Sequence, residues 1–172
     1  MNTMENSTIL KETENMSYED RMLYAFVNKP EKFYWYKKAF SKYNINGIKT
    51  FAWNWSWYSF FFPIFYLFYR KAYLFSALIF FVYSIASGIG EIFSLIVYII
   101  LGGTLPYIVY NRYIEKKKEI EENIKDENLR IETMARIGGT NNIVLYFSVV
   151  IIFFLLMTIY YVAMSINNNI SL

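Results

Sequence analysis

The sequence predicts an all-α integral membrane protein with three transmembrane helices, a short Pro-containing aromatic segment that is re-entrant or interfacial, and cytoplasmic amphipathic helices. Three observations predict this fold class. Apolar residues make up 56% of the 172 residues, more than the core of a soluble domain of this size can bury. Charged residues make up only 18%. The charges are also confined to blocks, because residues 53–111 carry only Arg70, Lys71 and Glu91, and residues 138–172 carry none.

The composition also excludes several classes of function. The chain has no Cys and no His, which excludes disulfides, thiolate nucleophiles and the commonest metal ligand. The net charge of +3 is small and its acids are interleaved with its bases, so we expect no nucleic-acid partner. No Gly-rich phosphate loop, paired-carboxylate motif or nucleophile elbow occurs. We therefore expect no catalytic residue, no cofactor and no metal site.

Residues 1–50 are predicted to form a tail and two cytoplasmic helices. Residues 1–16 are polar and are expected to be disordered, and they contain no apolar run typical of a signal peptide. Ser17 and Asp20 form a capping box in front of a short helix. Pro30 suits the first turn of a second helix. This second helix has one apolar face, made of Phe33, Tyr36, Phe40 and Tyr43.

The aromatic face of the helix at residues 30–43 has two interpretations. A basic amphipathic helix beside a membrane segment can lie in the lipid headgroup layer, and this is the interpretation that the sequence favours. The alternative is that the face packs on the protein's own cytoplasmic residues. Asn46 and Gly47 then predict a turn that ends the cytoplasmic region of residues 17–50.

Residues 51–71 are predicted to be the re-entrant or interfacial segment. Pro63 lies in its middle and breaks or kinks a helix there. Residues 55–69 would reach only about 22 Å as a helix, which is short of the ~30 Å hydrocarbon layer. The predicted interfacial anchors are Trp53, Trp55, Trp57, Arg70 and Lys71.

Three later segments are predicted to cross the membrane. Residues 72–88 and 92–110 form a helical hairpin, and residues 143–166 form an uncharged span without Gly or Pro. Between them, residues 111–142 are expected to be a charged cytoplasmic helix that stops at the Gly138-Gly139 turn. Its apolar seam is expected to pack on the helix at residues 30–43, and the alternative is that the seam dimerises as a short coiled coil. The seam consists of Tyr113, Ile120, Ile124, Ile131 and Met134.

The basic residues predict the topology. If residues 51–69 also crossed the membrane, residues 1–52 and 112–137 would lie on opposite sides of it. If residues 51–69 enter and return, all 17 Lys and Arg lie on one side, and only Glu91 and the uncharged tail of residues 167–172 lie outside. The positive-inside rule favours the second arrangement. The N-terminus is therefore predicted to be cytoplasmic and the C-terminus external.

Small and polar residues form a stripe on each helix of the predicted hairpin. Close helix packing is the favoured interpretation, because small residues let two backbones approach each other. The alternative is a polar path through an oligomer, and Glu91 is interpreted as a solvated loop acid. The stripe consists of Ala77, Ser84 and Gly88 on the first helix, and of Ser94, Tyr98 and Gly102 on the second.

Several short motifs occur in order along residues 22–165. They are Phe26-Val27-Asn28-Lys29, Tyr34, Lys37-Lys38, Trp53-Asn54-Trp55, Phe60-Phe61-Phe62-Pro63, Tyr69-Arg70-Lys71-Ala72-Tyr73, Asn111-Arg112-Tyr113 and Gly138-Gly139-Thr140-Asn141. In these motifs the chain resembles the bacterial membrane family named domain of unknown function 2628 (DUF2628). Phe62 is a departure, because that family usually has Gly before the Pro. The resemblance implies a small multi-pass protein of the bacterial inner membrane and implies no catalytic residue.

Three functional hypotheses remain open. The favoured one is a non-catalytic membrane interaction or assembly protein, whose partners are the lipid bilayer and either another protein or further copies of itself. The first alternative is an oligomeric transporter or channel subunit, for which intramembrane charges or inverted repeats would be expected. The second is an inner-leaflet lipid-modifying enzyme, which needs a cluster of polar catalytic residues at headgroup depth. The sequence displays neither signature.

Overall fold

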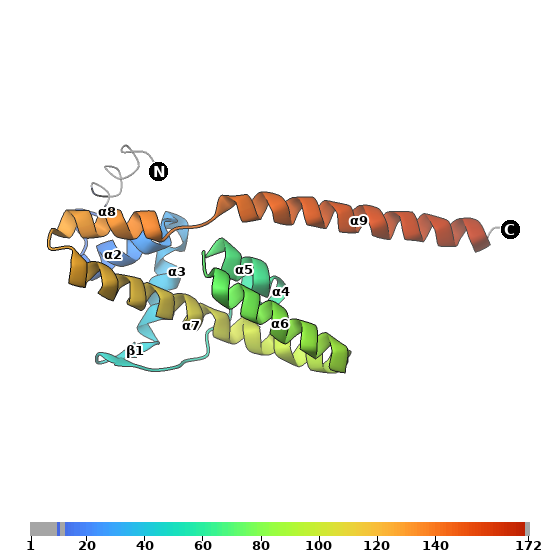
Figure 1. Cartoon of the computed structure of the whole chain (residues 1–172), viewed down its shortest axis with the longest axis horizontal. Coiled ribbons are helices and arrows are strands. Elements are labelled where there is room, and N and C mark those ends of the chain that lie inside the picture. Colours follow the sequence, from blue (N-terminus) through green and yellow to red (C-terminus); the bar gives the residue numbers. More distant parts are fainter. Residues whose placement is uncertain (1–9, 11–12, 171–172) are drawn as a thin grey trace. The chain divides into compact units, whose positions relative to one another are not determined.

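The computed structural model describes residues 10 and 13–170 and is mostly helical (Figure 1). The chain divides into two compact units, Met1–Thr140 and Asn141–Leu172, which are described separately. The first unit contains α2 (Tyr18–Val27), α3 (Pro30–Ser41), β1 (Asn44–Ile45), β2 (Ile48–Lys49), α4 (Trp57–Phe61), α5 (Pro63–Tyr69), α6 (Tyr73–Ile89), α7 (Glu91–Asn123) and α8 (Glu127–Ile137), and the second contains α9 (Asn142–Ile170).

The start of the described chain follows the predicted helix signals. The Ser17 Oγ accepts a hydrogen bond from the Asp20 N–H at 3.3 Å and so caps α2, and Pro30 is the first residue of α3. Most of the tail that was expected to be disordered lies outside the described residues. The expectation is wrong for residues 13–16, because the Thr13 side chain is buried and its carbonyl accepts a hydrogen bond from the Met16 N–H at 2.9 Å.

The turn predicted at Asn46 and Gly47 joins two short antiparallel strands, β1 and β2, which pair Ile45 with Ile48. Both turn residues have positive φ, 53° at Asn46 and 82° at Gly47. This is the backbone that a two-residue type I′ hairpin requires, and Asn-Gly is its preferred sequence. The all-α class therefore holds for most of the chain, with one small hairpin added.

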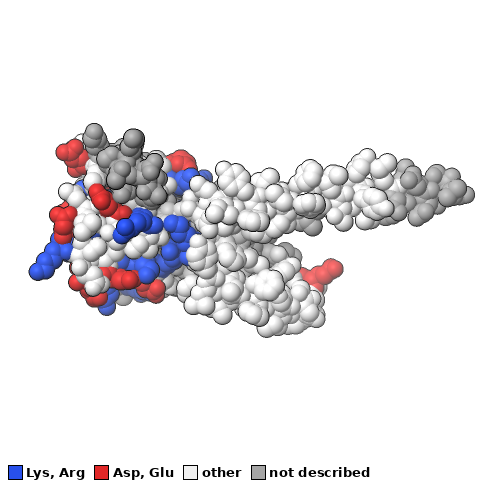
Figure 2. Space-filling model, turned by 45° about the horizontal axis from the view of Figure 1, so that its top comes forward, with Lys and Arg blue, Asp and Glu red and all other residues white. Residues whose placement is uncertain are grey.

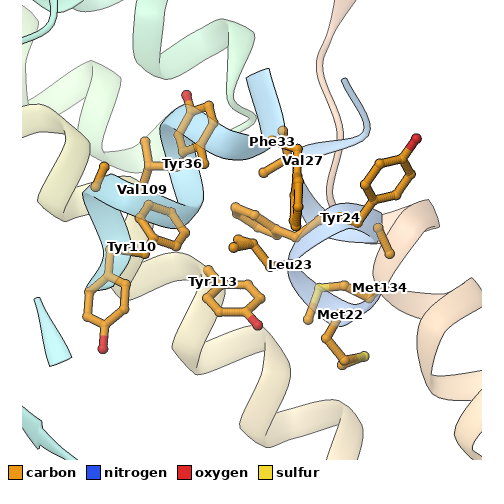
Figure 3. Close-up of a cluster of buried hydrophobic side chains, with 14 of the residues drawn as sticks. Met22, Leu23, Tyr24, Val27, Phe33, Tyr36, Val109, Tyr110, Tyr113 and Met134 are labelled. Carbon is orange, nitrogen blue, oxygen red and sulfur yellow. The ribbon is translucent and has the colours of Figure 1, made fainter. Parts of the chain in front are cut away.

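On the face that Figure 2 shows, charged side chains gather at one end of the first unit, over α2, α3, α8 and the C-terminal half of α7. We call this part the helical module. Side chains from its helices point toward one another in a common core (Figure 3). Its largest fully buried side chains include Met22, Phe26, Tyr43, Ile131 and Met134.

The aromatic face of α3 lies inside this core. The Phe40 ring centroid is 5.2 Å from that of Tyr110 and 5.6 Å from that of Tyr113, and the Tyr43 ring is 5.3 Å from Tyr110. The expectation that this face lies in the headgroup layer is therefore wrong. The alternative holds because α7 continues far enough into the module to cover the face with its own aromatic side chains.

The charged segment after the hairpin differs from the single helix that the sequence predicts. α7 ends at Asn123, the chain turns at residues 124–126, and α8 runs back. The Asp126 Oδ1 accepts a hydrogen bond from the Leu129 N–H at 2.7 Å, so a capping residue inside the predicted helix starts a new one. The seam residues Ile131 and Met134 are buried, but the neighbours of α8 are α2 and α7 rather than α3.

The apolar hairpin consists of α6 and the N-terminal half of α7. α6 extends through Ile89 and α7 starts at Glu91, so the connection expected at residues 89–91 is reduced to Gly90, whose φ of 151° favours Gly. α7 then runs without interruption through Pro106 to Asn123, which removes the predicted boundary at residue 111. α7 is long and apolar enough to cross a membrane. The part of α9 that ends at Val162 is also long and apolar enough to do so. α6 is apolar and shorter.

Residues 51–71 enter and return along the hairpin. α4 and α5 meet at Phe62, and Pro63 is the first residue of α5, so the predicted helix break is present. The start of the segment contacts Gly102 of α7, and the carbonyl at its end, on Arg70, accepts a hydrogen bond from Arg112 of the same helix. Both ends therefore lie toward the module end of the hairpin.

Candidate functional site

Residues 53–56, which we call the Trp strap, attach to α7 through their backbone. The Asn54 N–H donates to the Gly103 carbonyl at 3.1 Å, and the Ser56 N–H donates to the Gly102 carbonyl at 2.9 Å. The Gly102 carbonyl is available because the residue four positions later is Pro106, which has no N–H to donate. A proline inside α7 thus creates the acceptor that holds the strap.

Two glycines let the Trp rings lie directly on α7. A Cβ on Gly103 would lie 2.1 Å from the Trp53 ring, and a Cβ on Gly102 would lie 2.9 Å from the Trp55 ring. Trp57, the third predicted anchor of this segment, is 62% exposed, and its ring stacks on Phe61 at 5.8 Å. Gly102 therefore packs against the strap and against Phe60 of α4.

The predicted small-residue stripe does not join α6 to α7. Ala77, Ser84 and Gly88 are exposed, and no atom lies within 4 Å of a Cβ built on Gly88. The buried residues of α6 are Ser76 and Ala86, which lie outside the stripe, and the Ser76 Oγ donates to the Ile64 carbonyl of α5 at 2.9 Å. A large side chain of α6 contacts α7, because Tyr83 packs on Tyr98 with ring centroids 5.1 Å apart. Of the partner stripe, Ser94 is half-buried and its Oγ donates to the Gly90 carbonyl.

Three helices end at one place in the first unit. α2 ends at Val27, α5 ends at Tyr69 and α8 ends at Ile137. The Gly139 N–H donates to the Phe26 carbonyl at 2.8 Å, so the end of α8 is bonded to the end of α2. A Cβ on Gly138 would lie 2.7 Å from that same carbonyl oxygen, which explains why a residue without a side chain stands there.

Three cations occupy this meeting point, and we call Arg70, Lys71 and Arg112 the helix-end hub. The Arg70 Nη1 donates to the Val27 carbonyl at 3.1 Å, and the Lys71 Nζ donates to the Gly138 carbonyl. Arg112 bridges two ends, because its Nη1 donates to the Arg70 carbonyl at 3.2 Å and its Nη2 donates to the Ile137 carbonyl at 3.4 Å. Each hub residue thus satisfies a carbonyl that a helix end leaves open.

The electrostatics of the hub rest on helix ends. None of the ion pairs among the described residues includes Arg70, Lys71 or Arg112. The C-terminus of each helix carries partial negative charge, which favours a cation there. Burial, followed by repulsion from Arg112, lowers the pKa of Lys71. Burial also lowers the pKa of Arg112; Tyr73 raises it and Arg70 lowers it further.

Arg70 is the most enclosed member of the hub, with a side chain that is 3% exposed. Its Nε donates to the Tyr36 hydroxyl at 2.8 Å, and its guanidinium carbon lies 4.2 Å from the centre of the Tyr36 ring. Arg70 was predicted as an interfacial anchor, but its side chain points into the protein and ties α5 to α2 and α3. Lys71 is half-buried and is the more accessible of the pair.

The hub contains residues to which the sequence assigned no role. Arg112 was noted only within a motif, Tyr36 only as part of an apolar face, and Gly138 only as part of a motif and of a turn that stops a helix. Four of the motifs that carry the family resemblance, those beginning at Phe26, Tyr69, Asn111 and Gly138, meet at the hub. A signal was available in Arg112, since it is the first charged residue after the long apolar stretch of α7.

Comparisons with known proteins give one match. The family described as "Protein of unknown function (DUF2628)" matches residues 10–112, which include the strap, the apolar hairpin and all three hub cations. No curated protein and no solved structure matches the chain. In the part of the chain that the structure describes, no group of three or more Asp or Glu side chains is placed to hold a metal ion.

Proposed function

The chain belongs to the family described as Protein of unknown function (DUF2628), and from this membership and the two contrasting halves of α7 we propose that it is a multi-pass membrane protein with a non-catalytic assembly role. In this proposal the apolar hairpin crosses a cytoplasmic membrane, and the helical module lies against the cytoplasmic face of that membrane. The observation that carries the proposal is the surface of the hairpin.

That surface is mostly apolar, with Ser84, Ser87 and Glu91 as its exposed polar residues. A protein in water rarely exposes a contiguous apolar patch of more than a few hundred Å². Here large apolar side chains are exposed at successive turns of α6 and on the facing half of α7, as lipid contact requires. They are Leu74, Phe75, Leu78, Phe80, Phe81, Val82, Ile85 and Ile89 on α6, and Ile92, Phe93, Leu95, Ile96, Ile99 and Ile100 on α7.

Side-chain contacts between α2 and the chain that follows the hairpin support a specific membrane topology. The Arg21 guanidinium donates to Glu127 at 2.6 Å, and the Tyr18 hydroxyl donates to Glu121 at 3.0 Å. A bilayer cannot pass between side chains in contact, so α2 and α8 belong on one side. The chain between them must then cross an even number of times, which agrees with α6 and α7 crossing while residues 51–71 return. The positive-inside rule makes that side cytoplasmic.

The Trp strap, at the start of the returning segment, makes the backbone hydrogen bonds that a segment within the hydrocarbon layer requires. A non-helical backbone within the hydrocarbon layer must bond to protein, because no water is available there. The Trp strap satisfies this demand through the Gly102 and Gly103 carbonyls. α9 is then a third crossing, which puts the C-terminus on the external side. Its exposed apolar side chains, such as Phe147, Phe153 and Phe154, suit lipid contact.

An assembly role is supported by what the buried polar groups do. The hub cations bond helix carbonyls to one another, which is a structural use. The module then presents charged and aromatic side chains, including Tyr34 at 77% exposure, from a fixed position at the membrane face. We propose that this surface docks a protein partner.

The exposed stripe of α6 favours a second candidate, self-association. Ala77, Ser84 and Gly88 are exposed, a Cβ on Gly88 would meet open space, and small residues four apart, as Ser84 and Gly88 are, form a common helix-dimer contact in lipid. A transporter or channel subunit would build its path along such a contact.

Single-cysteine labelling tests the topology, because the chain has no native Cys. Cys probes replace Ser41, Asn123 and Asn168 in turn, and intact cells are treated with a membrane-impermeant maleimide. We expect position 168 to react from outside, and positions 41 and 123 to react only after lysis. Labelling of 41 and 123 from opposite sides would disprove the returning segment.

A further inference from the structure

We propose that Lys71 and Arg112, backed by Arg70, bind the phosphate of an anionic lipid headgroup at the cytoplasmic surface of the membrane. This inference rests on the proposed function, since it requires the hub to lie at a bilayer. It assigns a class of ligand, anionic lipid, to the helix-end hub, whose hydrogen bonds within the chain hold helix ends together.

The first argument is charge. The hub brings together three formal positive charges, and no described carboxylate pairs with any of them. The helix ends supply only about half an elementary negative charge each. Arg70 is nearly fully buried and Arg112 is half-buried, so water screens their mutual repulsion poorly. An anion beside the half-buried Lys71 and Arg112 would relieve that repulsion.

The second argument is hydrogen-bonding capacity. Toward the described residues, the three side chains make five hydrogen bonds. Two arginines and a lysine carry more than twice that number of N–H donors. The bonds already made hold Lys71 and Arg112 in place, and the remaining donors match phosphate oxygens, which guanidinium groups bind two at a time.

The third argument is position. Arg70 and Lys71 directly precede the apolar helix α6, and Arg112 directly follows the apolar stretch of α7. Headgroup phosphates lie at this level if the hairpin crosses the membrane. Beside the hub, Tyr73 is 48% exposed and Phe68 is 37% exposed, with ring centroids 5.8 Å apart. An aromatic pair of this kind suits the acyl chains next to a bound headgroup.

The test compares two lipids on the full chain. The purified protein is placed in mixed micelles with equal amounts of phosphatidylglycerol and phosphatidylcholine, and retained lipid is counted by native mass spectrometry. We expect the wild-type protein to retain phosphatidylglycerol at least about fivefold over phosphatidylcholine, the factor that one Lys or Arg at an anionic surface contributes. Equal retention of the two lipids would overturn the proposal without any variant.

Variants locate the lipid. Lys71→Gln keeps an N–H for the Gly138 carbonyl but removes the charge, and should reduce the preference about fivefold. Lys71→Arg keeps the charge and should retain the preference. Lys118→Gln is the matched control, because the Lys118 side chain is 76% exposed in the charged half of α7 and its nearest partner, Glu122, is 3.8 Å away. A control that loses as much preference as Lys71→Gln would refute a site at the hub.

Two further measurements separate this inference from others. Inorganic phosphate is titrated against chloride at equal ionic strength, with the thermal midpoint of the full chain as the readout. Stabilisation by phosphate without a lipid preference would replace the headgroup by a soluble anion and overturn the proposal. The cysteine labelling tests the membrane topology separately. If the labelling pattern is as expected and the lipid preference is missing, only the headgroup site is rejected. If the labelling pattern differs from the expected one, the proposed membrane topology itself is rejected.

Discussion

Residues 91–100 and residues 101–123 belong to the same helix, but their apolar side chains have opposite surroundings. In the first part, Ile92 is 79% exposed and Leu95 is 54% exposed. In the second part, Leu105 and Val109 are fully buried, and charged residues occupy the outer face. The difference is that residues 91–100 expose their apolar side chains, whereas residues 101–123 bury theirs on one face. Apart from Glu91 and Ser94, residues 91–100 are apolar on every side, whereas residues 112–123 have the single apolar face that is typical of a helix in water.

The boundary between the two halves is marked by backbone chemistry. Gly102, Gly103 and Pro106 follow the exposed residues directly, and the Trp strap bonds to α7 there. The strap rings cover the helix where it leaves the apolar hairpin and enters the module. The following predictions test whether the two halves differ as described, in order of decreasing effect.

The largest effect is expected from one substitution made in each half. Leu105→Ala removes a fully buried side chain and should lower the free energy of unfolding by about 2–5 kcal/mol. Leu95→Ala, its matched control, removes a side chain that faces detergent or lipid and should cost less than about 1 kcal/mol. Unfolding in detergent micelles, followed by circular dichroism, measures both. Equal losses would mean that Leu95 is buried against another protein surface.

The helix-end hub should respond almost as strongly. Arg70→Met keeps much of the apolar volume but leaves the Val27 carbonyl and the Tyr36 hydroxyl without their donor, which should cost about 2–4 kcal/mol. Lys118→Met changes an exposed cation of the same module and should stay within about 0.5 kcal/mol of wild type. The same unfolding measurement applies, and a neutral Arg70→Met would show that the hub does not hold the helix ends together.

The boundary itself is tested by adding a methyl group to a glycine in each part of the hairpin. Gly103→Ala places a Cβ inside the Trp53 ring and should cost about 1–3 kcal/mol. Gly88→Ala meets open space and should be neutral or stabilise by up to about 1 kcal/mol, since Ala favours helix. Trp53→Ala combined with Gly103→Ala should recover part of the loss. Strictly additive losses would contradict the contact between residues 53 and 103.

The smallest effect is expected at the exposed stripe. Ser84→Leu should change the free energy of unfolding by no more than about 0.5 kcal/mol in dilute detergent, because the Ser84 side chain is exposed and bonds only to its own helix. Ser84→Ala should change it equally little. Thermal midpoints at low protein concentration measure both. A drop of several degrees with Ser84→Leu alone would mean that the stripe lies against another helix.

Local signals predicted the parts of the fold that depend on a few neighbouring residues. The Ser17 cap, the first turn at Pro30, the Asn46-Gly47 turn and the break at Pro63 each follow from one or two side chains. The family resemblance was also confirmed. The returning path of residues 51–71 through a membrane, which was inferred from counting charges, stays a prediction.

Contacts between distant residues were beyond this kind of reasoning. The periodicity of α6 does not show which of its residues face α7, and the packing of Tyr83 on Tyr98 is one such contact between distant residues. The seam in residues 113–134 was identified as apolar, but Asp126 could be interpreted either as an exposed acid or as a cap, and the second use splits the helix. For the hub, the acceptors are backbone carbonyls, which every residue has and no sequence pattern marks.

Because α2 pairs with α8, the helical module can finish folding only late in the synthesis of the chain. The contact between Arg21 and Glu127 joins residues 106 positions apart. A ribosome adding 5–20 residues per second needs roughly 5–20 s to make the intervening chain. During that interval the hairpin emerges first, while Met22, Phe26 and Val27 have no α8 to cover them. The apolar side chains of α2 therefore stay uncovered by α8 until residues 127–137 have been made. We expect chaperones that hold unfolded chains to bind a nascent chain that is stalled before residue 127.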